Sequence, residues 1–325
     1  MMKKNDLRIV YMGTPDFAVE SLRCLVEGGY QVVGVVTMPD KPVGRHQTEL
    51  SASPVKQYAL QAGIKVLQPV KLKDEAFLEE LRSLQADLQI VVAFRMLPEV
   101  VWAMPRLGTF NLHASLLPQY RGAAPINWAV INGETQTGIT TFFLKHEIDV
   151  GDVIQQVPVP IEDTDDAGAV HDKLMMLGGR LVTETVDQIL AGTIRTTPQT
   201  EMIHEAGSVK PAPKIFKDTC RIDWSKGVKP VYDFIRGLAP YPAAWTEFVN
   251  GGGKIQTMKV FRTVKEFAVH THPVGTLLTD GKTWLKVAVP DGFVVLEDLQ
   301  LAGKKRMPVV DFLRGNRLDA GYSVR

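Results

Sequence analysis

The first half of the chain alternates short, β-branched apolar runs with amphipathic segments, and no other feature constrains the fold as strongly. The runs 7–13, 31–38, 87–94 and 108–115 are almost continuously apolar rather than apolar at every second position. Strands of this kind must be covered on both faces, so the alternation predicts a mostly parallel sheet between layers of helices. In such α/β folds, sites form beyond the carboxyl ends of strands, near a change in strand order.

The segments between these runs have apolar residues at helical spacing, namely 17–29, 53–63 and 74–85. Ser53 followed by Pro54 is a typical helix start, because Ser caps the free N–H groups and Pro is tolerated in the first turn. The region 138–161 lacks helical spacing and predicts two strands joined by a turn at 149–152. These elements extend the α/β pattern to about residue 161.

A long helix is expected over 166–191, interrupted at Gly178 and Gly179. After Gly192 the sequence becomes polar, contains prolines and loses periodicity, which is typical of a linker over 193–213. With 325 residues, two domains are expected. We therefore predict a catalytic domain at 1–192 and a second domain at 214–325.

The second domain is expected to be mainly β. A helix is expected near 228–238, and short strand-like runs with turn residues follow it, at 243–249, 255–264, 275–279, 285–290 and 291–301. Short strands at this spacing are typical of a small antiparallel barrel or sandwich. A five-stranded OB-like barrel fits the length and is a common nucleic-acid-binding architecture.

The net charge of +1 conceals an uneven distribution. Residues 1–205 contain 18 Lys and Arg against 25 Asp and Glu, whereas residues 206–325 contain 19 against 11. A basic second half suggests an acidic partner, with nucleic acid the first candidate. A basic surface kept only for solubility is an equally good interpretation of charge alone.

Several classes of protein are disfavoured. No apolar run approaches the ~20 residues of a membrane helix, and the N-terminal apolar run is short and broken by Gly13 and Pro15, which favours a first strand over a signal peptide. Cys24 and Cys220 lie far apart and outside any metal-binding spacing. We expect reduced thiols, no zinc site and a cytoplasmic protein.

Two polar residues stand out in the apolar stretch FNLHASLLP. Asn111 and His113 are two positions apart in an expected strand, so their side chains point to the same face, just before a tight loop. An amide and an imidazole in one small volume can stabilise an oxyanion, with about 3–4 kcal/mol per donor, and the imidazole can move protons. A structural pair bonded to backbone groups is the alternative, and the residues alone leave both open.

A carboxylate near His113 would hold the imidazole in place. Asp149, in the turn after a strand-like run, is the candidate, and Asp152 is its near competitor. An Asp in a turn that contains Gly usually serves the turn itself.

Two stretches nearer the N-terminus give weaker signals. Gly13 and Asp16 lie between a strand and a helix, as in dinucleotide folds, but there is no GxGxxG motif, so a nicotinamide site is disfavoured. The stretch 37–56 has no clear secondary structure and carries Lys41 and Arg45. Loops of this length are usually functional or disordered, and both interpretations stay open.

Taken together, these segments resemble the methionyl-tRNA formyltransferase family over nearly the whole chain. The motifs that carry the resemblance are GTPDFA (13–18), TMPDKPVGR (37–45), SPVK (53–56), FNLHASLLPQYRGAAPINWAVINGE (110–134), IDVGD (148–152), RIDW (221–224), APYPAAW (239–245) and LAGKKRM (301–307). The fourth motif is shared by folate-dependent formyltransferases in general. The other motifs favour the tRNA enzymes over relatives that formylate sugars or purine precursors.

The resemblance implies a Rossmann-like formyltransferase domain with a mostly parallel sheet, followed by a C-terminal OB-like barrel. It implies formyl transfer from 10-formyltetrahydrofolate to the methionine amine of initiator methionyl-tRNA, with Asn111, His113 and Asp149 as the catalytic residues and no metal. A sugar-nucleotide N-formyltransferase is the alternative enzyme. A non-catalytic RNA-binding protein on the same scaffold is disfavoured by the complete set of three residues.

The resemblance also assigns binding residues. The folate site is expected to be lined by Ser115, Leu116, Leu117, Pro118, Phe94, Arg95, Met96 and Leu97. Contacts to tRNA or its methionine are expected from Phe17, Arg45, Lys210, Lys214, Lys304, Lys305 and Arg306. The sequence departs from the family at Arg95, where Gly is common, and after Arg45, where lysines are common. A monomer without membrane contact is expected.

Overall fold

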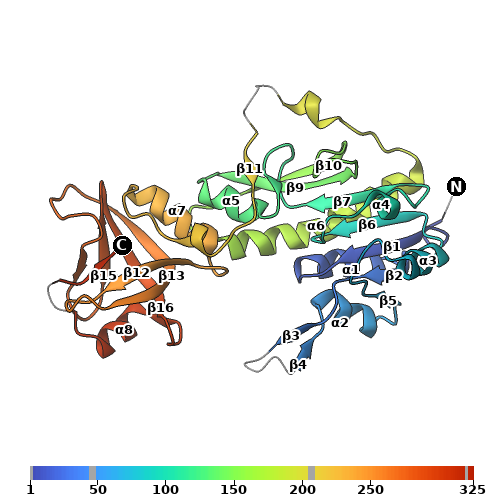
Figure 1. The fold of residues 1–325 in the computed structure, drawn as a ribbon. Coiled ribbons are helices and arrows are strands. Elements are labelled where there is room, and N and C mark those ends of the chain that lie inside the picture. The colour runs from blue at the N-terminus through green and yellow to red at the C-terminus, as the bar shows by residue number, and fades with distance from the viewer. Residues whose placement is uncertain (1–2, 44–48, 204–208, 319–320) are drawn as a thin grey trace. The chain divides into compact units, whose positions relative to one another are not determined.

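The computed structural model describes residues 3–43, 49–203, 209–318 and 321–325 (Figure 1). The chain divides into two compact units that interleave in sequence. The first unit comprises Met1–Gly122, Thr137–Pro160 and His171–Pro211, and the second comprises Ala123–Gln136, Ile161–Val170 and Ala212–Arg325. The domain boundaries at 192 and 214 remain predictions: the first unit continues past 192 to Pro211, and the second unit includes two segments that precede 192.

The first unit is built around a seven-stranded sheet of order β10-β9-β7-β6-β1-β2-β5. Its strands are β1 (Arg8–Gly13), β2 (Gln31–Val36), β5 (Val66–Leu67), β6 (Leu88–Val92), β7 (Thr109–His113), β9 (Gln136–Phe143) and β10 (Val153–Pro160). The five strands from β5 to β7 run parallel, and β9 is antiparallel to β7. The mostly parallel sheet is confirmed, and its strand order reverses beside β1, where the chain leaves β5 and continues at β6.

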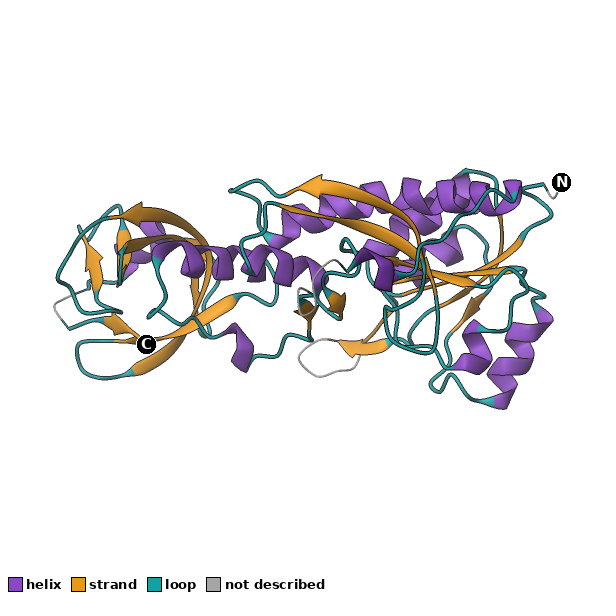
Figure 2. Cartoon of the chain, turned by 90° about the horizontal axis from the view of Figure 1, so that it is seen from above, coloured by secondary structure: helices purple, strands orange, loops and turns teal. Residues whose placement is uncertain are grey.

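Helices cover both faces of this sheet (Figure 2). They are α1 (Phe17–Glu27), α2 (Pro54–Gln61), α3 (Glu75–Ser83), α4 (Glu99–Trp102) and α6 (Ala167–Ala191). Val10 and Val91 pack against the α3 and α4 side, whereas the Tyr11 hydroxyl donates to the Ala18 carbonyl of α1 on the other side. The predicted start of α2 is confirmed, since Ser53 Oγ accepts from the backbone N–H of Lys56 at 3.1 Å.

The predicted interruption of the long helix is wrong. Helix α6 runs without a break through Gly178 and Gly179. A Cβ atom at Gly178 would lie 2.7 Å from Leu112 Cδ2, and one at Gly179 would lie 2.8 Å from Cys24 Sγ. These glycines therefore let α6 approach β7 and α1 closely, and the packing energy outweighs their poor helix propensity.

The stretch 37–56, expected to lack secondary structure, contains two short strands. β3 (Lys41–Val43) pairs antiparallel with β4 (Glu49–Ser51). At the base of this hairpin the Asp40 carboxylate accepts from Lys56 Nζ at 2.6 Å and from Gln68 Nε2 at 2.8 Å. Arg45 lies outside the described residues.

The expected linker also contributes structure of its own. It contains a 3₁₀ turn at Gln199–Met202 and β11 (Pro211–Ala212), which pairs with β8 (Arg121–Gly122). Thr197 exchanges two backbone hydrogen bonds with Val153, both at 2.9 Å. The part of this stretch before Ala212 belongs to the first compact unit.

The second unit is a nearly closed antiparallel barrel, which confirms the OB-like expectation. Its strand order is β14-β15-β16-β13-β12-β18, with β17 on β16. The strands are β12 (Ala244–Val249), β13 (Ile255–Phe267), β14 (Leu277–Thr279), β15 (Leu285–Val289), β16 (Gly292–Leu301), β17 (Met307–Pro308) and β18 (Ser323–Val324). A bridge between Thr276 and Ser323 joins the two ends of the sheet.

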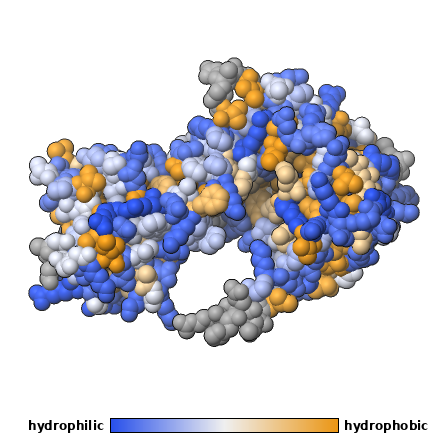
Figure 3. All heavy atoms as spheres, viewed as in Figure 1, coloured by the Kyte–Doolittle hydropathy of each residue, from blue (hydrophilic) through white to orange (hydrophobic). Residues whose placement is uncertain are grey.

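Helices accompany the barrel within the second unit. They are α5 (Pro125–Ile131), α7 (Val228–Leu238) and α8 (Val309–Gly315), with a 3₁₀ turn at Asp218–Cys220. Val231 and Ile235 of α7 and Phe312 of α8 belong to the buried core beneath the strands. The face of this unit seen in Figure 3 is mainly hydrophilic. Within the described ranges, no helix is long and apolar enough to cross a membrane.

Candidate active site

Asn111 and His113 lie at the carboxyl end of β7, which β6 separates from β1, where the strand order reverses. Phe110 and Leu112 are buried on the opposite face of the strand, where Leu112 lies beneath α6. Asn111 is in register with Val91 of β6, whose side chain belongs to the α3 and α4 side. The polar pair therefore shares that side of the sheet, as its two-residue spacing predicts.

The imidazole of His113 is buried and held by a backbone group. Its Nε2 lies 2.8 Å from the carbonyl oxygen of Tyr120. A carbonyl only accepts, so Nε2 carries a proton and donates. Nδ1 then lies 3.9 Å from Oδ2 of Asp149, with both side chains at least 88 % buried. That distance is too long for a hydrogen bond, so Nδ1 is the nitrogen available to substrate.

Asp149 is fixed by the turn between β9 and β10. Its backbone has φ +54°, and its Oδ2 accepts from the backbone N–H of Gly122 at 3.0 Å. The competing carboxylate, Asp152, forms an ion pair with Lys145 at 2.7 Å instead. Of the two acids in this turn, Asp149 is thus the one directed at the imidazole.

Two residues that the sequence did not single out complete this arrangement. Gln199, 1 % exposed, donates from Nε2 to the backbone carbonyls of Asp149 and Gly151, both at 2.8 Å. Its Oε1 accepts from Nε and Nη2 of Arg121 at 3.0 and 2.7 Å. Gln199 sits in a polar, aperiodic stretch, where neither hydrophobic pattern nor motif distinguishes it from its neighbours.

The amide of Asn111 has no hydrogen-bond partner of its own within the described part of the chain, and the residue is half-buried. A half-buried amide without a partner can donate to a ligand at no cost in lost internal bonds. Together, Asn111 and His113 can offer donors to one developing negative charge, with Asp149 behind the imidazole. This arrangement suits attack on a carbonyl-type carbon.

The loop after β7 is shaped by its own polar contacts. Ser115 is fully buried, and its Oγ donates to the Gln119 carbonyl at 2.6 Å. Leu117 packs with Phe142 and Val153, Pro118 is buried, and Leu116 is half-buried. The side chains of Ser115 and Leu117 therefore build the loop itself, which leaves its backbone and Leu116 as the groups available to a ligand.

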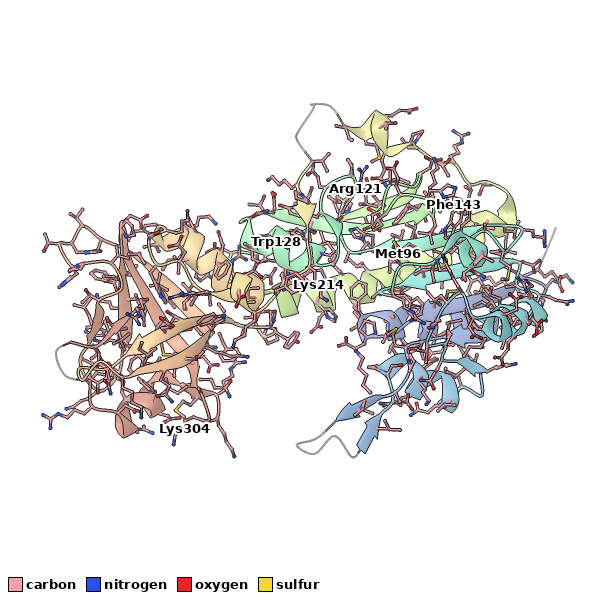
Figure 4. The ribbon with its side chains drawn as sticks, viewed as in Figure 1. Met96, Arg121, Trp128, Phe143, Lys214 and Lys304 are labelled. Carbon is pink, nitrogen blue, oxygen red and sulfur yellow. The ribbon has the colours of Figure 1, made fainter. Side chains whose placement is uncertain are left out.

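The loop after β6 lies on the same edge of the sheet. Phe94 is half-buried, Met96 is 73 % exposed (Figure 4), and Leu97 joins the core around α3 and α4. The guanidinium of Arg95 donates to the carbonyls of Pro69 and Val70, and burial lowers its pKa from the usual value. Arg95 thus ties this loop to the segment after β5 and does not extend toward solvent.

The residues expected to contact tRNA are divided between the two units. Phe17 is 7 % exposed and packs edge-on against His171, with ring centres 5.2 Å apart. Lys210 lies beside the β7 loop, where its backbone N–H donates to Gln119 Oε1 at 2.9 Å. The second unit contains Lys214, Lys304, Lys305 and Arg306, of which the first two are marked in Figure 4.

These basic residues differ in their surroundings. Arg306 forms an ion pair with Asp298 at 2.5 Å, and its guanidinium lies 4.2 Å from the centre of the Phe261 ring. Lys304 and Lys305 lie in the turn between β16 and β17, are exposed, and have no ion-pair partner among the described side chains. Their charges are therefore better placed than that of Arg306 to meet an external anion.

As for metals, no three His, Cys, Asp or Glu side chains in the described ranges come together in a way that could hold an ion.

Two family models and several curated proteins match most of the chain. The formyl transferase model matches residues 7–186, and the formyl transferase C-terminal domain model matches 214–317. The chain is 68 % identical to the methionyl-tRNA formyltransferase of Bacteroides thetaiotaomicron over 323 residues, which is 99 % of this chain and 100 % of that protein. The enzyme of the same name from Parabacteroides distasonis is 67 % identical over the same shares of both chains.

The chain belongs to the methionyl-tRNA formyltransferase family. Among solved structures, an N-formyltransferase from Helicobacter canadensis, in complex with folinic acid and dTDP-3-aminofucose, has a TM-score of 0.63. It shares 18 % identity, and the match covers 93 % of this chain and 100 % of that one, so it supports the fold alone.

Proposed function

We propose that the chain transfers the formyl group of 10-formyltetrahydrofolate to the α-amino group of methionyl initiator tRNA, the step that prepares this tRNA for translation initiation. The observation that carries the proposal is the convergence of Asn111, His113 and Asp149 at the carboxyl end of β7 in a chain of this family. A cytoplasmic site of action follows from the proposal.

The reaction needs a new bond between the amine nitrogen and the formyl carbon, and loss of the bond from that carbon to N10 of the folate. As the neutral amine attacks, the formyl oxygen becomes negative. Donors from the Asn111 amide and from Nδ1 of a protonated His113 stabilise that charge, and each is expected to contribute about 3 kcal/mol. The carboxylate of Asp149, 3.9 Å away, stabilises the imidazolium.

The amine must also lose a proton, and N10 must gain one. Nε2 of His113 is held by Tyr120, so Nδ1 is the position from which the ring exchanges a proton. Asp149, directly or through water, is the acceptor for the amine proton, which then passes to N10. Holding two substrates in line is expected to supply much of the rate, up to about 7–11 kcal/mol.

The donor is proposed to bind between the loops after β6 and β7. Backbone groups of 115–118 and the side chains of Leu116, Phe94 and Met96 are the lining groups that the observed burial leaves available. Arg95 would act indirectly, since its bonds to Pro69 and Val70 fix the shape of the β6 loop.

The acceptor tRNA is proposed to bind through the 37–56 hairpin and the basic second unit. Arg45 is predicted to read the acceptor end, and Lys210, Lys214, Lys304 and Lys305 are predicted to contact phosphates. Contacts of this type release counterions, so acceptor binding should weaken steeply as salt is raised.

The test is a competition between acceptors. The purified chain is given radiolabelled 10-formyltetrahydrofolate together with methionyl initiator tRNA and an amino-sugar nucleotide. The proposal expects label on the methionine amine. Label recovered mainly on the sugar would assign the chain to the alternative enzyme class, and no transfer to either acceptor would reject both.

A further inference from the structure

We propose that Gln199 is a positioning residue for Asp149, and that the segment after α6 thereby takes part in catalysis. The inference rests on the proposed function, because it assigns Asp149 a role in formyl transfer. It goes beyond the three residues of the site, since Gln199 lies 50 positions from Asp149 and outside the matched family segments.

The amide of Gln199 is buried and uses its full bonding capacity. Both protons of Nε2 go to backbone carbonyls, those of Asp149 and Gly151, and Oε1 takes two protons from Arg121. A guanidinium only donates and a carbonyl only accepts, so the orientation of this amide is determined by its partners. Such a side chain cannot rotate without losing four hydrogen bonds at once.

These contacts close a ring around the carboxylate. Arg121 is followed in the chain by Gly122, whose N–H donates to Oδ2 of Asp149 at 3.0 Å. Gln199 therefore holds the backbone of Asp149 while Gly122 holds its side chain, and Arg121 links the two. Asp149 is thus held at its backbone by Gln199 and at its carboxylate by Gly122 of β8.

Asp149 needs this support because of its backbone. Its φ of +54° is a left-handed conformation, which is uncommon outside Gly although Asp adopts it more readily than most residues. Once the two bonds from Gln199 are lost, the turn is free to relax, and the carboxylate then moves relative to Nδ1 of His113. Misplacing a catalytic group by about 1 Å costs on the order of 10²-fold in rate.

A buried glutamine with only a structural role would also destabilise the fold when replaced, so stability alone does not test the inference. The informative variant is Gln199→Glu, which keeps an oxygen for Arg121 but turns a second oxygen toward the two carbonyls. Gln199→Ala is the second variant. Thr200→Ala, next in the chain and exposed, is the matched control.

The measurements are the single-turnover rate of formyl transfer to methionyl initiator tRNA with both substrates saturating, and the affinity for a non-transferable folate. Both Gln199 variants are expected to lose about 10²-fold in rate. Their folate affinity, and both properties of Thr200→Ala, are expected to change by less than about threefold, because the side-chain hydrogen bonds of Gln199 go to Asp149, Gly151 and Arg121 and not to the proposed lining groups at 94–97 and 115–118.

A double variant separates positioning from general disruption. If Gln199 acts through Asp149, adding Gln199→Ala to Asp149→Ala should lower the rate by no more than about twofold, since coupled residues are not additive. Gln199 variants as fast as Thr200→Ala, or losses that multiply in the double variant, would overturn the inference. An inactive wild-type chain would overturn the proposed function, and the inference with it.

Discussion

Replacing Gly151 with Ala should disable the site through backbone geometry alone. Gly151 lies in the same turn as Asp149, and a Cβ atom there would lie 1.6 Å from the carbonyl oxygen of Phe143 and 2.8 Å from its carbonyl carbon. Both are backbone atoms of β9, so no side-chain rotation relieves the clash. An ordinary contact of this kind is about 3.4 Å or more, so the turn must move by well over 1 Å.

Such a shift exceeds the distance that separates a productive catalytic group from an unproductive one. We therefore expect Gly151→Ala to lower the single-turnover rate of formyl transfer by at least about 10²-fold. The barrel of the second unit should still unfold at the same denaturant concentration, since Gly151 belongs to the first unit.

The matched control is Gly315→Ala, where an added Cβ meets no atom within 4 Å. It should transfer formyl groups at the wild-type rate. A Gly151→Ala chain that keeps more than about half of the wild-type rate would refute the link between this turn and catalysis.

Three further predictions concern recognition and stability. Arg45→Ala should reduce the ratio of transfer rates on initiator and elongator methionyl-tRNA, and an unchanged ratio would exclude Arg45 from tRNA discrimination. Gly178→Val should destabilise the first unit by about 1–3 kcal/mol in urea unfolding, because the added Cβ would lie 2.7 Å from Leu112 Cδ2 and overpack the contact between α6 and β7. An unchanged urea midpoint would show that the helix adjusts freely. Asp233→Ala should lower the free energy of unfolding of the second unit by about 3–5 kcal/mol, because it removes the ion-pair partner of Arg236, which is 7 % exposed and lies 2.8 Å from that carboxylate. A decrease below about 1 kcal/mol would mean that the pair is solvated.

The sheet and the barrel could be predicted because their signals are local. Continuously apolar runs such as 87–94 require cover on both faces, and short runs separated by Gly and Asp give an antiparallel barrel. The same-face arrangement of Asn111 and His113 followed from strand geometry, and their place at a strand end followed from the loop residues after Ala114.

The parts that could not be predicted depend on contacts between distant segments or on backbone groups. Gly178 and Gly179 looked like a helix break, because their close approach to Leu112 and Cys24 exists only in the folded chain. The Tyr120 carbonyl that sets the tautomer of His113 has no sequence signal, since every residue has a carbonyl. Gln199 was taken as part of a linker, because the partners of its side chain are backbone carbonyls in a turn about 50 residues away in the sequence.

The central claim is that His113, with Asp149 behind it, carries out formyl transfer at the end of β7. The measurement that tests it most directly is the single-turnover rate of label transfer from 10-formyltetrahydrofolate to methionyl initiator tRNA, for the wild type and for His113→Ala and Asp149→Ala, with folate affinity measured alongside. We expect each variant to lose about 10²–10⁴-fold in rate while it still folds and binds the donor. Near-normal transfer by either variant would contradict the assigned mechanism.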